Sequence, residues 1–137
     1  MEPYSTALVR VPPEAVQESD LRYLQKAVNL EYNGMTLEDL FEQLAGGWLG
    51  IWRLEGEAQG IIAWKLLKHP GGLELFIWAV VGKGYIKAFP EIFEQVKAEA
   101  NRMGCRWIAG DTRSRALDKV YAFTGAKEIS KHFVMEL

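Results

Sequence analysis

The sequence predicts a mixed α/β domain built around one sheet, and three observations carry that prediction. Apolar segments of strand length at 48–54, 59–67 and 73–81 follow one another with only short turns between them. A long helical pattern and a short strand at 106–109 come next, which completes the order of a β-α-β crossover. The length of 137 residues suits one domain, so we expect residues 1–137 to fold as a single unit.

The chain is predicted to begin with a strand and a helix. Residues 6–11 are typical of a strand, which must end at Pro12-Pro13 because proline has no N–H to donate to a sheet. A helical pattern then runs from Ser19 to Asn33, with apolar residues at three- and four-residue spacing. That spacing places the apolar side chains on one face, which we expect to cover the sheet.

A second helix is predicted over residues 36–44. Thr36 and Asp39 have the form of a capping box, in which each side chain binds the backbone N–H of the other residue. Leucines and a phenylalanine repeat at helical spacing behind this cap, and Gly46 ends the pattern.

The three central strands are expected to form an antiparallel meander, because short turns cannot connect parallel strands. Within the third of them, residues 76–81 are apolar throughout rather than alternately apolar and polar. Such a run indicates a strand that is covered on both of its faces.

The C-terminal part is predicted to alternate between helices and strands. Because proline suits only the first turn of a helix, Pro90 predicts that the regular helix begins near Ala88 or Phe89, after a loop of about four residues. The strand at 106–109 would then lie parallel to the third central strand. A helix at 115–123 and a closing strand at 132–137 give the order β-α-α-β-β-β-α-β-α-β.

Composition and charge exclude several classes of protein. A single cysteine, Cys105, excludes an internal disulfide framework and a cysteine-based zinc cluster, and we expect no metal site. No apolar run is long enough to span a bilayer, and the N-terminus lacks the basic and apolar regions of a signal peptide. We therefore expect a soluble, cytoplasmic protein without membrane partners. A pI of about 5.7 and the absence of a basic stripe with interleaved aromatics argue against nucleic-acid binding.

The charge is unevenly distributed along the chain. Residues 1–60 carry four basic and ten acidic residues, whereas residues 61–137 carry twelve basic and eight acidic residues. A basic second half can indicate a partner that carries phosphates, although an uneven but solvated surface would look the same.

The order of elements, together with particular residues, resembles the GNAT family of N-acetyltransferases. The resemblance covers nearly the whole chain and is most specific from residue 98 to the end. The residues that carry it are Ala100-Asn-Arg-Met-Gly-Cys-Arg-Trp-Ile, Tyr121-Ala-Phe-Thr-Gly125-Ala126 and Val134-Met135. A narrower resemblance, to small GNAT-like proteins of tailed bacteriophages, rests on Thr36-Leu-Glu-Asp-Leu, Ala45-Gly-Gly, Trp52, Met103-Gly-Cys-Arg and Gly110-Asp-Thr-Arg.

The GNAT resemblance implies acetyl-CoA as cofactor, held by backbone groups where the strands at 73–81 and 106–109 part. It implies that the pyrophosphate lies at the start of the following helix, where free N–H groups and the helix dipole attract an anion. The cofactor-binding candidates are Val80, Val81, Gly82, Lys83, Gly84 and Lys87. The chain departs from the family at Ala79, where the family has glutamine or arginine. A plain turn at Gly82-Lys83-Gly84 is therefore an open alternative.

The resemblance also implies two candidate catalytic residues. Tyr121 aligns with the tyrosine that protonates the departing thiolate, and a phenol suits such general-acid work. Glu74, at the start of the 73–81 strand, is the candidate base for the acceptor amine. Each has a structural alternative, because Tyr121 would also suit a helical core position and Glu74 an exposed strand position.

Two functions follow from this sequence. The first is an acetyl-CoA-dependent N-acetyltransferase that acts on an amine of a small molecule or protein. The alternative is a catalytically inactive GNAT-like virion or accessory protein of a phage, which would act through protein contacts as a homo-oligomer or within a phage particle, and would be located in the virion.

Overall fold

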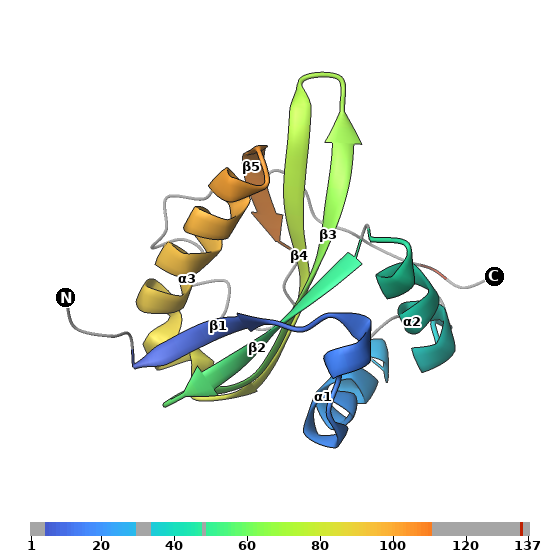
Figure 1. Cartoon of the computed structure of the whole chain (residues 1–137), viewed down its shortest axis with the longest axis vertical. Helices are drawn as coiled ribbons and strands as arrows, with labels where there is room; N and C mark the ends of the chain where they lie inside the picture. The colour runs from blue at the N-terminus through green and yellow to red at the C-terminus, as the bar shows by residue number, and fades with distance from the viewer. Residues whose placement is uncertain (1–4, 30–33, 48, 111–134, 136–137) are drawn as a thin grey trace.

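The computed structural model describes residues 5–29, 34–47, 49–110 and 135 of the chain. Its described part is a mixed sheet in the order β1-β2-β3-β4-β5, flanked by three α-helices and a short 3-10 helix (Figure 1). The elements are β1 Thr6–Arg10, η1 Pro13–Ala15, α1 Glu18–Asn29, α2 Leu37–Ala45, β2 Leu49–Gly56, β3 Gln59–His69, β4 Gly72–Lys83, α3 Tyr85–Arg102 and β5 Cys105–Gly110.

The sheet has the predicted topology. β1 to β4 pair antiparallel with their neighbours, and β5 pairs parallel to β4. The parallel pair is joined by α3, as a crossover between parallel strands requires. The mixed α/β prediction is thus confirmed up to residue 110. The helix predicted at 115–123 and the strand predicted at 132–137 fall on residues that the structure does not describe, apart from Met135.

Helices cover both faces of the sheet. α3 packs on one face, where a core cluster includes Ile77 of β4 together with Ile92 and Val96 of α3. α1 and α2 pack on the other face, over a second cluster that contains Leu24 and Leu40. The two helical layers lie on opposite sides of the strands in Figure 1. β4 contributes side chains to both clusters, which confirms that it is covered on both faces.

A β-bulge interrupts the regular alternation of β4. Trp64 of β3 pairs with Ile77, while the preceding Ala63 pairs with Ala79, so Trp78 is the extra residue. Ile77 packs on the α3 side, whereas Trp78 and Ala79 both pack on the α1–α2 side. A bulge both reverses the alternation of side chains and bends the strand, so it changes the course of β4 at this point.

The predicted start of the long helix is wrong. α3 begins at Tyr85, directly after Gly84, and Pro90 lies inside the helix rather than in its first turn. Gly84 has a φ of 74°, a left-handed conformation that glycine adopts without strain, and it turns the chain from strand to helix in one residue. Burial of Phe89, Ile92, Val96 and Ala100 on one face holds the helix together across the proline.

The other predicted boundaries differ from the observed ones by a few residues. The capping box of α2 is confirmed, since Thr36 N–H donates to Asp39 Oδ2 at 2.9 Å and Asp39 N–H donates to Thr36 Oγ1 at 3.2 Å.

None of the described helices is long and apolar enough to cross a membrane.

Candidate functional site

The candidate site lies along β4, because the pairing between β4 and β5 stops midway along β4. Their pairing ends at Ile77 and Gly110. From there residues 78–83 continue β4, and among the described residues only β3 pairs with them. This leaves a free edge of about 20 Å, whose outward N–H and C=O groups can bind an extended ligand in the manner of another strand. The Trp78 bulge lies at the point where the two strands part.

The candidate residues Val80 and Val81 lie on this free edge. Val80 pairs with Ile62 and faces the α3 side, whereas Val81 pairs with Ile61 and faces the α1–α2 side. Their side chains are partly buried and pack against the two core clusters, while their backbone groups lie at the edge.

Two glycines bring β4 close to β3 before the helix begins. Gly82 pairs with Gly60, and a Cβ at Gly82 would lie only 2.0 Å from the carbonyl oxygen of Gln59. Both residues have positive φ, of 153° and 145°. Only glycine therefore allows the backbones of β3 and β4 to lie this close together at Gly60 and Gly82.

The N-terminus of α3 differs from the N-termini of α1 and α2. Gly84 provides no side-chain cap, and the first turn holds no acidic residue, whereas α1 has Glu18 and Asp20 there and α2 has its capping box. The first three N–H groups of a helix have no intrahelical acceptor. Because Lys83 directly precedes the helix and Lys87 lies in its first turn, with no acidic residue there, the start of α3 suits an anion.

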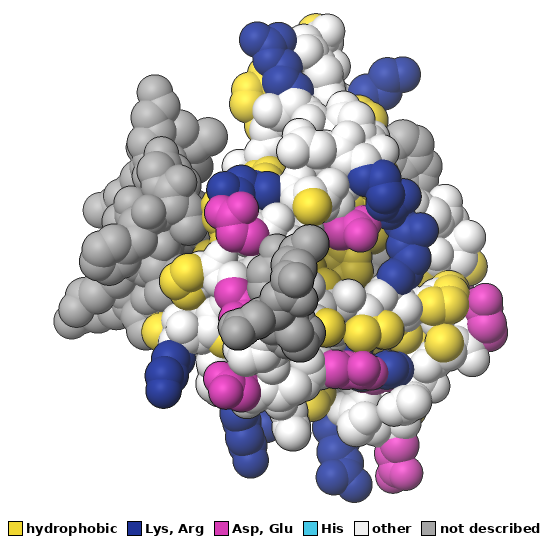
Figure 2. All heavy atoms as spheres, turned by 60° about the vertical axis from the view of Figure 1, so that its left-hand side comes forward, with side chains coloured by type: hydrophobic (Ala, Val, Ile, Leu, Met, Phe, Trp, Pro, Cys, Tyr) yellow, Lys and Arg dark blue, Asp and Glu magenta, His cyan; other side chains and the backbone are white. Residues whose placement is uncertain are grey.

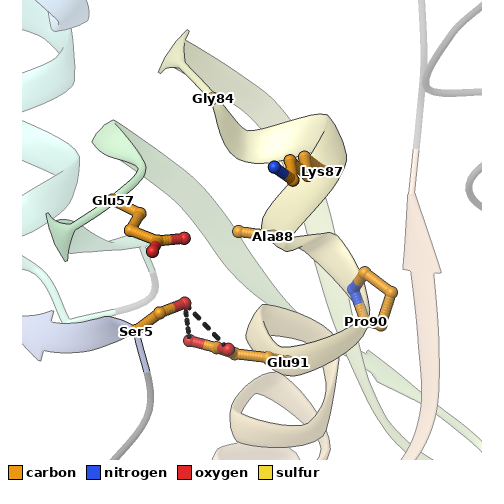
Figure 3. A pocket seen from close by; sticks show the side chains of 7 residues that line it. All are labelled: Ser5, Glu57, Gly84, Lys87, Ala88, Pro90 and Glu91. Carbon is orange, nitrogen blue, oxygen red and sulfur yellow. Dashed lines mark hydrogen bonds between the residues drawn. The ribbon is translucent and has the colours of Figure 1, made fainter.

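Lys87 lines a pocket of about 450 Å³ beside this helix start (Figure 3). Its lining comprises Ser5, Glu57, Gly84, Lys87, Ala88, Pro90 and Glu91. Glu91 accepts hydrogen bonds from Ser5 Oγ at 2.9 and 3.0 Å and is therefore engaged, while Glu57 faces into the pocket beside Lys87. The pocket lies between α3 and the starts of β1 and β3, so Lys87 is on the side of α3 away from β5.

Glu74 lies at the opposite end of β4 from Gly84, about 30 Å away along the strand. It precedes the parting of β4 and β5 by three residues, and its register partner on β5 is Trp107. His69 Nε2 lies 3.2 Å from Glu74 Oε1, and the Glu74 side chain is 19% exposed. The structure therefore places Glu74 and the candidates Gly82, Lys83 and Gly84 at opposite ends of one strand. Tyr121 lies outside the described residues.

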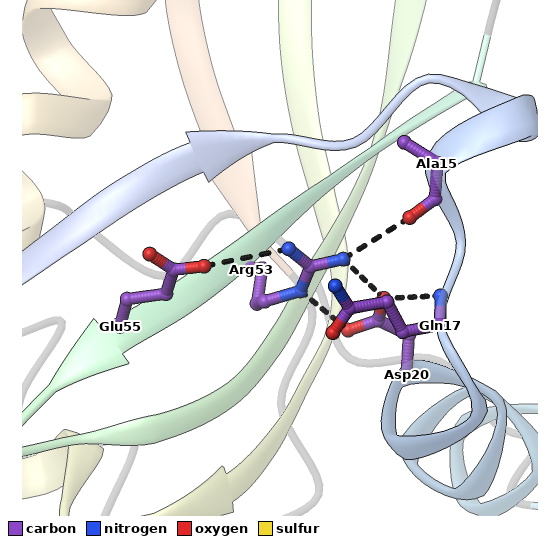
Figure 4. A network of polar contacts seen from close by, with 5 residues as sticks. All are labelled: Ala15, Gln17, Asp20, Arg53 and Glu55. Atoms are coloured by element: carbon purple, nitrogen blue, oxygen red, sulfur yellow. Dashed lines mark hydrogen bonds and ion pairs between the residues drawn. The ribbon is translucent and has the colours of Figure 1, made fainter.

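A buried ion pair fixes α1 to the sheet and was not predicted (Figure 4). Arg53 Nη2 lies 2.6 Å from Asp20 Oδ2, and Arg53 Nε donates to Asp20 Oδ1 at 2.9 Å. Burial by itself raises the pKa of the Asp20 carboxyl, but hydrogen bonds from Arg53 and from Gln17 N–H, with the charge of Arg53, outweigh it and hold that pKa below its usual range. Asp20 and Arg53 also line a second pocket, of about 300 Å³, at the same end of the sheet as Gly84.

Acidic and basic side chains are interspersed on the side of the molecule that carries α3 (Figure 2). No continuous basic surface is present on the coloured part of this view. Within the described ranges there is also no group of three or more side chains that could hold a metal ion.

Comparison with solved structures agrees with this architecture. An aminoglycoside acetyltransferase from an uncultured soil metagenomic sample, solved with sisomicin, superposes with a TM-score of 0.68 at 11% identity over 97% of both chains. A predicted acetyltransferase from Clostridium acetobutylicum, solved with acetyl-CoA, gives 0.64 at 14% identity over 96% of both chains. The Trypanosoma brucei acetyltransferase gives 0.61 at 13% identity, over 96% of this chain and 99% of that chain.

No family model matches the sequence, and no curated protein is significantly similar to it. At these identities the structural likeness establishes the fold. The chain has the GNAT fold of acetyltransferases, as the order of its elements predicted.

Proposed function

We propose that this protein is an acetyl-CoA-dependent N-acetyltransferase that acts on an amine. The observation that carries the proposal is the parting of β4 and β5, which leaves the edge of residues 78–83 free and leads to an uncapped helix start at Tyr85. A similar fold has been solved with acetyl-CoA, in the Clostridium acetobutylicum protein.

The chain's own groups suit the extended arm and the pyrophosphate of that ligand. Backbone N–H and C=O groups of residues 78–83 would align the extended arm, and the first N–H groups of α3 would hold the pyrophosphate. Lys83 and Lys87 would add positive charge to that end. The acetyl group would then lie near Ile77, where an amine approaching from the Glu74 end could attack it.

The reaction needs one bond made and one broken. The amine nitrogen attacks the thioester carbonyl, a C–N bond forms, and the C–S bond breaks to release the thiolate. The amine must lose a proton, for which Glu74 is the candidate acceptor, directly or through water. The thiolate must gain a proton, for which Tyr121 is the candidate donor.

Thermal unfolding with and without acetyl-CoA tests the cofactor part of the proposal. A ligand at a hundred times its dissociation constant stabilises the folded state by about 2.7 kcal/mol, which for a chain of this size raises Tm by roughly 8 °C. Lys83→Glu should weaken binding about tenfold, because it places a carboxylate beside the phosphates. Lys68→Glu, the same change at the far tip of the β3–β4 hairpin, is the matched control and should leave binding unchanged.

The alternative is a GNAT-like phage protein without catalysis. One of its three supports is gone, because Pro90 does not displace the start of α3 from Gly84. Two supports remain: Ala79 stands where the family has glutamine or arginine, and parts of the sequence resemble the small GNAT-like proteins of tailed bacteriophages. Unchanged Tm at saturating acetyl-CoA, together with self-association in light scattering, would favour this alternative over the enzyme.

A further inference from the structure

The pocket beside the start of α3 contains charges that nothing in the described part of the chain neutralises. The Lys87 ammonium has no hydrogen bond or ion pair with any described residue, and the same holds for the Glu57 carboxylate. Figure 3 shows both side chains pointing into the same space, with the Ala88 methyl group on its wall. An ammonium and a carboxylate are thus both available to a ligand in this pocket.

Glu91 adds a second carboxylate to the pocket. It accepts hydrogen bonds from Ser5 Oγ and Thr6 N–H, which are both neutral donors. No ion pair joins it to a described residue, although Lys87 lies four residues earlier on the same face of α3. The pocket therefore holds two carboxylates and one ammonium, and none of the three has a partner of opposite charge among the residues that the structure describes.

Hydrogen bonds between three elements hold the walls of the pocket together. Glu57 N–H donates to Ser5 O at 2.9 Å, which joins the β2–β3 turn to the start of β1. Ser5 and Thr6 in turn bind Glu91 of α3. Gly84 lies against the same turn, because a Cβ at this position would be 3.3 Å from Glu57 O. The charged groups therefore project from a frame that is already in place, which lowers the cost of binding a ligand.

Two carboxylates and one ammonium define the charges of a complementary ligand. Carboxylates pair with ammonium and guanidinium groups, and a lysine ammonium pairs with a carboxylate. A ligand with two cationic groups and one carboxylate therefore matches the pocket group for group. The pocket volume of about 450 Å³ also lies within the range of about 300–1,000 Å³ that small-molecule sites span.

We propose that this pocket binds a free basic α-amino acid. Lys87 pairs with the carboxylate of the ligand, and Glu57 and Glu91 pair with its two cationic groups. The inference goes beyond the proposed transfer reaction, because the pocket lies between α3 and the starts of β1 and β3, on the side of α3 away from β5. It shares Lys87 with the proposed pyrophosphate site.

The test uses L-arginine as probe, with two analogues that each lack one of its charges. L-Citrulline has a neutral group in place of the guanidinium, and L-argininamide has a neutral amide in place of the carboxylate. Each is titrated into the full chain at about pH 6, where α-amino groups are protonated, while the backbone amides are followed by NMR. We expect saturable shifts at Glu57, Lys87 and Ala88, and about fivefold weaker binding of both analogues. No saturable shift with arginine at these amides, or equal affinity for arginine and argininamide, would overturn the inference.

Matched variants assign the charges to their residues. Glu57→Gln keeps the size of the side chain and removes its charge, so it should weaken arginine binding about fivefold. Glu42→Gln, at an exposed position on α2, is the control and should have no effect. Equal affinity of these two variants for arginine would overturn the inference as well.

Lys87→Gln gives the sharpest result, because it removes only the group that binds the ligand carboxylate. It should weaken arginine binding about fivefold and should not weaken argininamide binding. Lys26→Gln, at an exposed position on α1, is the control and should affect neither ligand. The comparison is made between two ligands on one variant, so it holds even if that variant is less stable. Equal weakening of both ligands by Lys87→Gln would contradict the role of the ammonium.

These titrations contain no acetyl-CoA, and separate samples are titrated with acetyl-CoA alone, so that the two claims fail separately. Binding of acetyl-CoA without binding of arginine refutes the amino-acid site and leaves the proposed function standing. Binding of arginine with the expected order of analogues, but without any binding of acetyl-CoA, refutes the transferase and leaves the amino-acid site.

Discussion

At the scale of single residues, the Asp20–Arg53 pair is the interaction whose loss should cost most. Asp20 is 1% exposed, and Arg53 binds it through two nitrogens while also donating to Ala15 O. The pair joins α1 to β2 and holds η1 beside them. Removing one partner of a buried ion pair leaves the other charge without compensation, which is more destabilising than the pair itself is stabilising.

Asp20→Asn is therefore expected to lower the free energy of unfolding by about 2–3 kcal/mol at neutral pH, measured by urea denaturation. Arg22→Ala is the control, because the Arg22–Glu18 pair has side chains that are 79% and 86% exposed. Such a pair contributes less than about 0.5 kcal/mol. A smaller loss for Asp20→Asn than for Arg22→Ala would show that the buried pair does not hold α1.

The lowered pKa of Asp20 gives this contribution a pH dependence. A carboxyl whose pKa is lower in the folded state stabilises the fold above its unfolded pKa, and this is lost as pH falls through the folded value. The difference in stability between the wild type and Asp20→Asn should therefore shrink in acid, below about pH 4. A difference that stays constant from neutral to acid pH would contradict the assigned cause.

At the scale of elements, the contact between α3 and β1 closes the outer edge of the sheet. Gln95 accepts from Leu8 N–H at 3.0 Å and donates to Thr6 O at 2.7 Å, while Glu91 accepts from Thr6 N–H. The Gln95 amide thus takes the place of a peptide group in a further strand. An edge with its donors and acceptors engaged in this way is not available to pair with another chain.

Gln95→Leu should expose that edge and lower stability by about 1–2 kcal/mol, because the N–H of Leu8 and the carbonyl of Thr6 lose their partners. Hydrogen exchange should be faster at Leu8 than at the β3 amides of the same variant. Gln25→Leu is the control, since Gln25 binds Asn29 on the exposed side of α1. Unchanged exchange at Leu8 would mean that the amide is protected by something other than Gln95.

Helices and strands could be predicted from the sequence where the interactions that set their bounds are between residues close together in the chain. Thr36 and Asp39 lie three residues apart, so their capping box could be recognised and is confirmed. Pro90 misled the prediction because tertiary burial of Phe89 and Ile92 outweighs the local cost of a proline. The Trp78 bulge could not be seen, because the run from Phe76 to Val81 is apolar throughout and carries no alternation to be interrupted.

The candidate site was predictable in part for the same reason. Gly82 and Gly84 could be singled out from the sequence as a turn or an anion site, but only the structure shows that Gly82 lies against the backbone of β3 and that Gly84 turns the chain into α3. The surroundings of Glu74 could not, since His69 is a local neighbour but Trp107 is brought to it only by the parallel pairing of β5. Likewise, nothing near Asp20 in the sequence indicates Arg53.

At the scale of the whole molecule, the groups assigned to the proposed function lie along β4. Its first half is enclosed between β3 and β5, and its second half, which leads into the start of α3, pairs with β3 alone among the residues that the structure describes. The proposed phosphate site and the candidate base Glu74 therefore lie at opposite ends of one strand, with the bulge at Trp78 between them. An extended ligand along this strand would join the two ends.

The most direct test is to map acetyl-CoA onto the backbone by amide NMR during a titration of the full chain. We expect the largest shifts on residues 78–83 and on the first turn of α3 at Tyr85, Ile86 and Lys87. The amide resonances of β1 and β2 should not shift. An absence of shifts at saturating acetyl-CoA, or shifts confined to other parts of the chain, would contradict the claim that the free edge of β4 holds the cofactor.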